Sequence, residues 1–291
     1  MKNLLVLLLL LVCALLHAEV KICAHCGKGA RHLPYTAENR SFCSRGCLAA
    51  KFSCSACGEL PQGRYMLSTA SDGTTHRFCS RCSKYPRCFS CMLPSLNRRT
   101  LEDGRNQCRS CYRAVLPAEK YQQLMEELRR DLKQLYGFDT GHKIILRQVS
   151  KKALEQISKD PASLGCMKVD VNKITYTKGR QQRTEVKWKC TLYILSDLPV
   201  VSAAKIMAHE LTHDYLYHHA GRGSDPKITE GICEAVSAAY LTSKRYTSYV
   251  AAMEKNPDPV YGTGFRLIFP QLKSYGLKGV VERYRSNFTP F

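Results

Sequence analysis

The pairing of its cysteines constrains this chain more than any other feature. Of its 16 cysteines, twelve fall into close pairs, which are Cys23/Cys26, Cys43/Cys47, Cys54/Cys57, Cys79/Cys82, Cys88/Cys91 and Cys108/Cys111. Two such turns place four sulfurs around one tetrahedral metal and close its coordination sphere. Taken in order, the pairs predict three structural zinc sites, in folds of the zinc-ribbon or treble-clef kind.

Two alternatives exist for these cysteines. Disulfide bonds would suit an exported protein, but repeated two-residue spacing is poor disulfide geometry and good zinc geometry. His76 precedes Cys79 by three residues and could replace one ligand of the middle site. That exchange would strand Cys82, so the all-cysteine pairing is preferred.

The spacing of the sites also indicates modules. Residues 19–50 contain one site and predict a single zinc finger. Residues 51–114 contain two sites, with five residues between Cys82 and Cys88. Two zinc units fused this closely look like a LIM domain, which normally binds other proteins. A protein partner is therefore expected for this module.

The first 18 residues predict a signal peptide. Lys2 precedes an unbroken apolar run from Leu4 to Leu16, and Ala18 is small enough for cleavage. The run is short for a transmembrane helix. We expect an exported protein, periplasmic, secreted or tethered by an uncleaved signal, with no transmembrane helix in the mature chain.

The chain is strongly basic. Its formal charge of +20 falls to about +14 if twelve thiolates hold three zinc ions. A basic surface suits acidic lipids, polyanions, acidic proteins or simple solubility. The fingers show no obvious basic recognition helix, so no specific nucleic-acid binding is expected.

Composition changes after Cys111, and residues 115–291 predict a second domain. Apolar residues at helical spacing indicate a helix near its start, namely Tyr121, Leu124, Leu128, Leu132 and Leu135. The segments 143–149 and 184–195 are typical of strands. A helix is predicted over 199–219, with Ser196 and Asp197 available to cap its start.

This last helix contains the motif "HELTH". His209 and His213 lie one turn apart and point to the same side, so their imidazoles can share one zinc. Glu210 lies about 100° around the helix from His209, where it can reach a water on that zinc and act as general base.

A catalytic zinc needs a third protein ligand. His219 is one candidate, but Leu216 stands where a glycine would turn the chain back, so His219 should point away. Glu230 and Glu234 lie four apart on a following helix. We assign Glu230 as the ligand and Glu234 as the acceptor that orients a histidine. The two roles could be exchanged, or the pair could be an exposed helical face.

Together these residues predict hydrolysis of a protein or peptide substrate by a zinc-activated water, with Glu210 moving the proton. The strand at 185–195 is expected to offer an edge for extended substrate. Cys166 and Cys190 could form a disulfide or remain buried thiols, and Cys233 is expected in the core. The rival interpretation is a zinc-finger adaptor with a degenerate peptidase domain.

Several segments together resemble a known family. "PRCFSC…CRSC", "LPVVSAAKIMAHELTH", "TEGICEAVSAAYL" and "PVYGTGFR" occur in the order found in the plant DA-one family, LIM-domain proteins with a ubiquitin-activated zinc peptidase half. The resemblance covers about residues 52 to 291. It implies an α+β fold, with small zinc modules followed by a mainly helical, gluzincin-type metallopeptidase domain with a small sheet.

The resemblance also implies roles for single residues. His209, His213 and Glu230 match the family's zinc positions, and Glu210 matches its catalytic glutamate. One catalytic and three structural zinc ions are therefore expected. We expect no room before the LIM-like module for the ubiquitin-interacting helices of the plant proteins, so ubiquitin activation is not carried over. An exported, bacterial-type relative fits this architecture.

Overall fold

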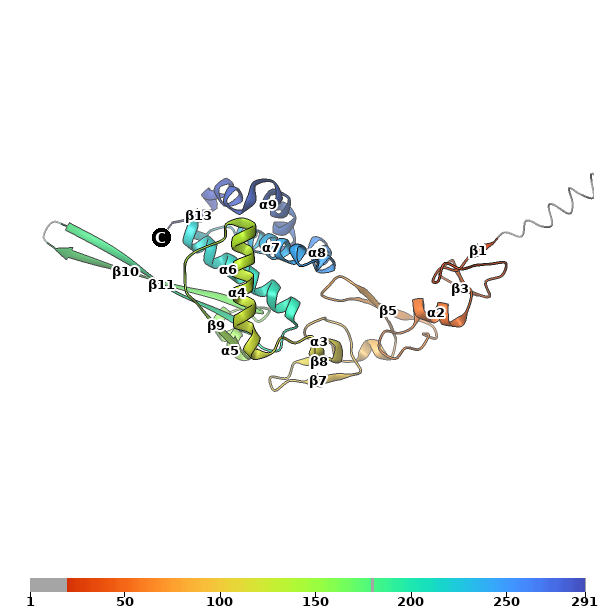
Figure 1. The fold of residues 1–291 in the computed structure, drawn as a ribbon. Coiled ribbons are helices and arrows are strands. Elements are labelled where there is room, and N and C mark those ends of the chain that lie inside the picture. The colour runs from red at the N-terminus through yellow and green to blue at the C-terminus, as the bar shows by residue number, and fades with distance from the viewer. Residues whose placement is uncertain (1–19, 179–180, 291) are drawn as a thin grey trace, which may run out of the picture. The chain divides into compact units, whose positions relative to one another are not determined.

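The computed structural model describes residues 20–178 and 181–290. The predicted signal peptide, residues 1–18, lies outside this range. The described chain forms two compact units (Figure 1). The first unit contains the described residues up to 68, together with 75–86 and 94–96. The second unit contains residues 69–74 and 87–93 and the described residues from 97 onward. A search of the described helices for one long and apolar enough to cross a membrane finds none.

The first unit consists of cysteine loops and short hairpins. Its hairpins pair β1 (Lys21–Ile22) with β2 (Gly29–Ala30) and β3 (Tyr35–Ala37) with β4 (Arg40–Phe42), and α2 (Arg45–Phe52) follows. Ser44 caps α2 by accepting a hydrogen bond from the Cys47 amide. Leu33, Phe42 and Phe52 form a small buried core beside Cys23. The hairpin of β5 (Tyr65–Thr69) and β6 (Thr75–Cys79), then the 3-10 turn η1 (Cys82–Lys84), carry the next cysteines.

The second unit has a three-stranded sheet with strand order β10-β11-β9. β10 (Gly165–Lys178) is antiparallel to β11 (Gln181–Leu195), and β11 is parallel to β9 (Ile144–Val149). β9 covers β11 only from Cys190 to Leu195. The rest of the hairpin therefore extends beyond the sheet as a two-stranded ribbon (Figure 1).

This topology corrects one prediction. The strand at 185–195 was expected to offer the edge for substrate, but its end within the sheet is paired on both sides. The strand next to the helix of the "HELTH" motif that has a free edge is β10. The strongly apolar pattern of residues 190–195 reflects this central position, because a central strand is buried on more sides than an edge strand.

Helices cover the sheet and build most of the core. They are α4 (Tyr121–Tyr136), α5 (Lys151–Ser158), α6 (Val200–His219), α7 (Pro226–Ser243), α8 (Thr247–Glu254) and α9 (Tyr261–Arg283). α6 packs against β10 and β11 on one side and against α7 on the other. α7 and α9 approach so closely that a side chain at Gly231 would meet the Gly264 backbone at 2.7 Å. Short elements complete the unit: η2 (Ala118–Lys120), β12 (Arg222–Gly223), η3 (Arg285–Asn287) and β13 (Phe288–Thr289).

The start of α6 differs from the sequence prediction. Pro199 occupies the cap position and makes no side-chain capping bond. Ser196 and Asp197, the expected caps, instead accept hydrogen bonds from Arg105 and Arg99. The side-chain oxygens of Ser196 and Asp197 therefore accept hydrogen bonds from arginines and not from the first amides of α6.

Those contacts come from the third cysteine loop, which lies in the second unit. It contains β7 (Arg98–Thr100), β8 (Asn106–Cys108) and α3 (Arg109–Arg113). Gln107 is fully buried and donates to the Asp197 carbonyl at 2.7 Å. Asp103 accepts from Arg105 and from the Lys151 amide at the start of α5. These hydrogen bonds attach the third cysteine site to the helices of the second unit. The domain boundary expected from sequence, between residues 114 and 115, would instead place this site and the helices in different domains. That boundary stays a prediction from sequence.

Candidate metal centre

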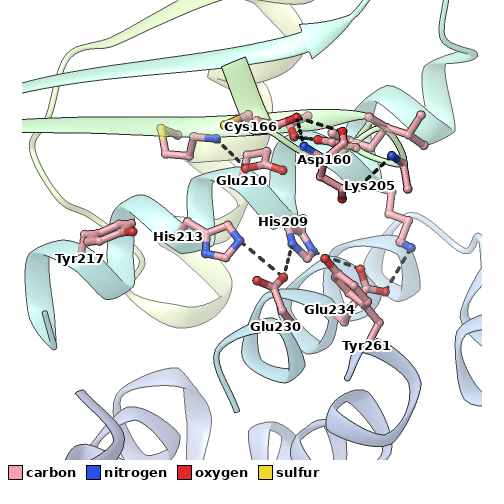
Figure 2. A pocket seen from close by; sticks show the side chains of 17 residues that line it. Asp160, Cys166, Lys205, His209, Glu210, His213, Tyr217, Glu230, Glu234 and Tyr261 are labelled. Carbon is pink, nitrogen blue, oxygen red and sulfur yellow. Dashed lines mark hydrogen bonds and ion pairs between the residues drawn. The ribbon is translucent and has the colours of Figure 1, made fainter. Parts of the chain in front are cut away.

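A cavity of about 460 Å³ lies between β10, α6, α7 and the start of α9. Figure 2 shows the side chains that line it, and they include His209, Glu210 and His213 of the "HELTH" motif. The chemically active side chains around it are Asp160, Cys166, Lys205, His209, Glu210, His213, Tyr217, Glu230, Glu234 and Tyr261. The structure therefore brings together all five residues assigned to the catalytic site from sequence.

The two histidines converge on one carboxylate oxygen. Oε2 of Glu230 lies 3.0 Å from Nε2 of His209 and 3.6 Å from Nε2 of His213. Ligands about 2.0–2.1 Å from a tetrahedral zinc are about 3.3 Å apart. The two nitrogen–oxygen distances are thus close to those between ligands of one zinc ion, and the three side chains have the chemistry of a two-histidine, one-carboxylate site.

Glu234 lies behind His209 and not at the convergence point. Its Oε1 is 3.0 Å from Nδ1 of His209, the nitrogen that faces away from Glu230. Its Oε2 is 3.1 Å from Nζ of Lys205. A carboxylate on the outer nitrogen fixes the tautomer and the ring orientation of a metal-binding histidine. The geometry favours the predicted division of roles between Glu230 and Glu234.

Glu210 faces the opposite wall of the cavity. It is 8% exposed, and its Oε2 accepts a hydrogen bond of 2.7 Å from the Met167 amide on β10. Gly165 permits this approach, because a side chain there would meet Ile206 at 2.5 Å and Cγ of Glu210 at 3.0 Å. The free edge of β10 therefore runs directly past the glutamate.

The charges of the site favour a cation. Burial opposes the charged form of His209, but its contacts with Glu230 and Glu234 outweigh burial and raise the pKa of His209 to about 10. Burial likewise opposes ionisation of Glu234, yet Lys205 and His209 hold its pKa at about 2. The pKa of Glu230 is also lowered, against burial, by its two histidine partners. Ionised carboxylates around two imidazoles suit a divalent ion.

Cys233 and His219 are the nearby alternatives. Sγ of Cys233 lies 3.6 Å from Nδ1 of His213, so with His209 and His213 it also forms a possible metal-binding set. It faces the nitrogen of His213 that points away from Glu230, and burial raises the pKa of its thiol well above the usual range. His219 is exposed and contacts the Asp139 carbonyl. Neither lines the cavity.

Sequence reasoning missed several lining residues. Lys205 precedes His209 by four residues, about one helical turn. Residues at this spacing lie on the same face of a helix, so the sequence could have indicated that Lys205 is near the site. Tyr217 and Tyr261 are the tyrosines that line the cavity, out of 16 in the chain. Tyr261 starts α9, 52 residues after His209, so nothing local in the sequence could have selected it.

The paired cysteines gather into the three predicted sets of four. Within each set the Sγ atoms all lie within 4.8 Å of one another, and those of Cys43 and Cys47 and of Cys91 and Cys108 are 3.5 Å and 3.8 Å apart. Four thiolates about 2.3 Å from one zinc have this spacing. His76 is outside the second set, which consists of cysteines alone. All three sets are chemically suited to zinc.

Cys166 and Cys190 are free thiols. In the antiparallel register Cys166 faces Tyr193, and Cys190 faces Val169. Their positions differ by an odd number of residues along the ladder, so the two side chains point to opposite faces of the sheet. A disulfide between them is excluded in this fold.

Comparison with known proteins relates the second unit to one family. The DA1-like family model, described as "Protein DA1", matches residues 137–256, which include α6 and α7. The chain is 25% identical to the "LIM domain-containing protein HDR3" of Oryza sativa subsp. japonica, over 69% of this chain and 53% of that protein. It is 26% identical to "Protein DA1-related 2" of Arabidopsis thaliana, over 69% of this chain and 50% of that protein.

The chain thus spans about half the length of the curated relatives it matches. No solved structure matches it. The chain is therefore similar to DA1-like and LIM-domain proteins over part of its length, and its cysteine sets are plausible zinc-binding modules.

Proposed function

We propose that this protein is a zinc-dependent endopeptidase with zinc-binding modules that recruit or restrain its substrate. The observation that carries the proposal is the convergence of His209, His213 and Glu230, with Glu210 beside them, in a cavity bordered by a free strand edge. Three protein donors leave a fourth tetrahedral position for water, which is the pattern of catalytic zinc.

His209, His213 and Glu230 would hold the ion. When bound, zinc supplies a water of lowered pKa and polarises a carbonyl group. Glu234 keeps Nε2 of His209 directed at the ion by accepting from its Nδ1. Glu210 takes the proton of the attacking water and delivers it to the leaving amine.

An extended peptide would pair with β10. The Met167 amide points toward the cavity, since it donates to Glu210. Amides on alternate residues of a strand point the same way, so Gly165 and Val169 present theirs along the same edge. Strand addition would hold the scissile bond in register above α6. Tyr217 and Tyr261 border the same space and are candidates to stabilise the oxyanion.

The test is Glu210→Gln in the zinc-loaded protein, with denatured casein as substrate. We expect proteolysis to fall by about 10²–10⁴-fold, because the general base is lost. Zinc content should stay at the wild-type level, since Glu210 is not a ligand. Glu119→Gln, on an exposed 3-10 turn, is the matched control and should cleave like the wild type. Unchanged proteolysis by Glu210→Gln would refute the proposal.

The adaptor interpretation makes a different prediction. One of the two relatives is named for a LIM domain, which favours protein binding by the cysteine modules. A degenerate peptidase domain would bind zinc only at the cysteine sets. Loss of one zinc ion per chain in His209→Ala/His213→Ala would support the fourth site, and an unchanged zinc content would favour the adaptor. Export of the chain, like recruitment of a protein partner, remains part of the proposal.

A further inference from the structure

A second polar cluster lies in the core of the second unit, outside the cavity. His142 comes from the segment between α4 and β9, Cys190 from β11 and Asp214 from α6. The side chains of His142 and Asp214 are 8% and 2% exposed, and Cys190 is fully buried. None of the three lines the cavity of the candidate metal centre.

The donor atoms of this cluster form a small triangle. Oδ1 of Asp214 lies 2.9 Å from Nδ1 of His142 and 3.2 Å from Sγ of Cys190, and Sγ lies 3.4 Å from Nδ1. Sulfur, imidazole and carboxylate donors of a tetrahedral zinc are about 3.3–3.6 Å apart. A bound ion would therefore spread these atoms by only a few tenths of an ångström.

The Asp214 carboxylate is a deeply buried group that could carry charge in this cluster. It accepts from the Thr140 hydroxyl at 2.8 Å and from the Cys190 thiol at 3.2 Å, and its Oδ1 lies 2.9 Å from Nδ1 of His142. The Arg129 guanidinium lies nearby and donates to the backbone carbonyl of His142. A buried carboxylate is costly unless charge or a metal compensates it, so the cluster suits a cation.

A divalent ion would neutralise the cluster. One carboxylate and one thiolate balance its two charges, with the imidazole neutral. On binding, the Cys190 thiol loses its proton to solvent, the imidazole proton moves to Nε2, and Nδ1 and Sγ bond to the metal. The ring is already held in place, since Trp188 stacks on it at 4.7 Å and His218 packs edge-to-face at 4.6 Å.

We propose that His142, Cys190 and Asp214 form an additional structural metal site, suited to zinc, that ties β11 and the start of β9 to α6. Zinc accepts this mixture of sulfur, nitrogen and oxygen ligands. Water or the Thr140 hydroxyl would complete the coordination. Asp214 follows His213 directly, so the site would anchor the end of the "HELTH" segment. The inference does not depend on catalysis.

Anomalous diffraction at the zinc absorption edge tests the site in the wild-type protein. We expect a peak within bonding distance of Nδ1 of His142, Sγ of Cys190 and Oδ1 of Asp214. Peaks at the cysteine sets with none here would reduce the cluster to a hydrogen-bond network and overturn the inference. A peak here with none between His209, His213 and Glu230 would instead sink the proposed function.

Metal content of folded variants gives a second test. Asp214→Asn keeps the shape of the side chain but weakens the ligand, and Cys190→Ser removes the sulfur. By mass spectrometry of the intact chain, each should carry one metal ion fewer than the wild type. Glu119→Gln neutralises an exposed carboxylate outside the cluster and should keep the full number. Full metal content in both Asp214→Asn and Cys190→Ser would contradict the site.

Discussion

The first and third cysteine sites have the same gap between their cysteine pairs but different surroundings. In both, 16 residues separate the second cysteine from the third. The residue before the third cysteine is Phe42 in one and Gln107 in the other, and both are fully buried. Phe42 packs into a core of the first unit's own residues, whereas Gln107 bonds to Asp197 at the approach to α6. Cysteine spacing predicts a metal site, but the side chains between the cysteines decide whether it is a separate module.

The largest effect is expected when one cysteine is removed from each of the two sites, which tests whether only the third site supports the second unit. Cys88→Ser should lower the stability of the second unit by more than about 3 kcal/mol, because metal binding at a structural site contributes directly to folding. It should also abolish proteolysis. Cys23→Ser should leave the thermal transition of the second unit unchanged. Equal losses in calorimetry would show that both sites belong to one cooperative unit.

Substitution at the matched buried positions is expected to have a smaller effect. Gln107→Leu leaves the Asp197 carbonyl without this donor and removes one of the two side-chain acceptors of Arg99, so it should destabilise the second unit by about 2–3 kcal/mol. Phe42→Leu should destabilise the first unit only. Denaturant titration followed by the fluorescence of Trp188, the single tryptophan, reports the second unit.

Acid should weaken the attachment of the third site. Although burial opposes ionisation of Asp103, Arg105 and the Lys151 amide lower its pKa below the ordinary 3.8. A lowered folded-state pKa stabilises the fold above the unfolded pKa, and this stability is lost as pH falls through the folded value. We expect the second unit to lose stability below about pH 4.

Asp103→Asn should flatten this part of the pH profile, measured as melting temperature against pH. The control is Glu119→Gln, which should keep the wild-type slope. If the melting temperature of Asp103→Asn falls with pH as steeply as that of the wild type, the Asp103 carboxylate does not cause the loss of stability in acid.

The smallest effect is expected at a surface contact of the first unit. Glu38 accepts hydrogen bonds from Tyr65 and Arg77, but its side chain is 43% exposed, and exposed ion pairs contribute little. Glu38→Gln should increase amide exchange in the β5–β6 hairpin and leave proteolysis unchanged. Hydrogen exchange read by mass spectrometry checks this, and reduced proteolysis would indicate a link between the two units.

Local patterns were predictable, and contacts between distant segments were not. The cysteine sets, the helix bearing His209 and His213, and the carboxylate pair follow from spacing within one or two turns. Gln107 and Asp197 are 90 residues apart, and no periodicity relates them. The prediction that residues 185–195 offer the substrate-binding edge was wrong. Apolar alternation indicates that a strand is buried, but it does not show which neighbouring strands pair with it. Ser196 and Asp197 carry cap-forming side chains, but a cap and an arginine compete for the same oxygens.

The β10–β11 ribbon has a practical consequence. Beyond the part covered by β9, no strand of the described residues pairs with either of its edges, and Ile174, Tyr176 and Val186 are 37%, 52% and 42% exposed. Open edges with apolar side chains can pair with another chain. Lys173 and Lys187 interrupt the apolar surface and oppose such pairing by charge repulsion. Concentrated solutions should therefore be kept at low salt, because screening these lysines would allow one ribbon to add to the next.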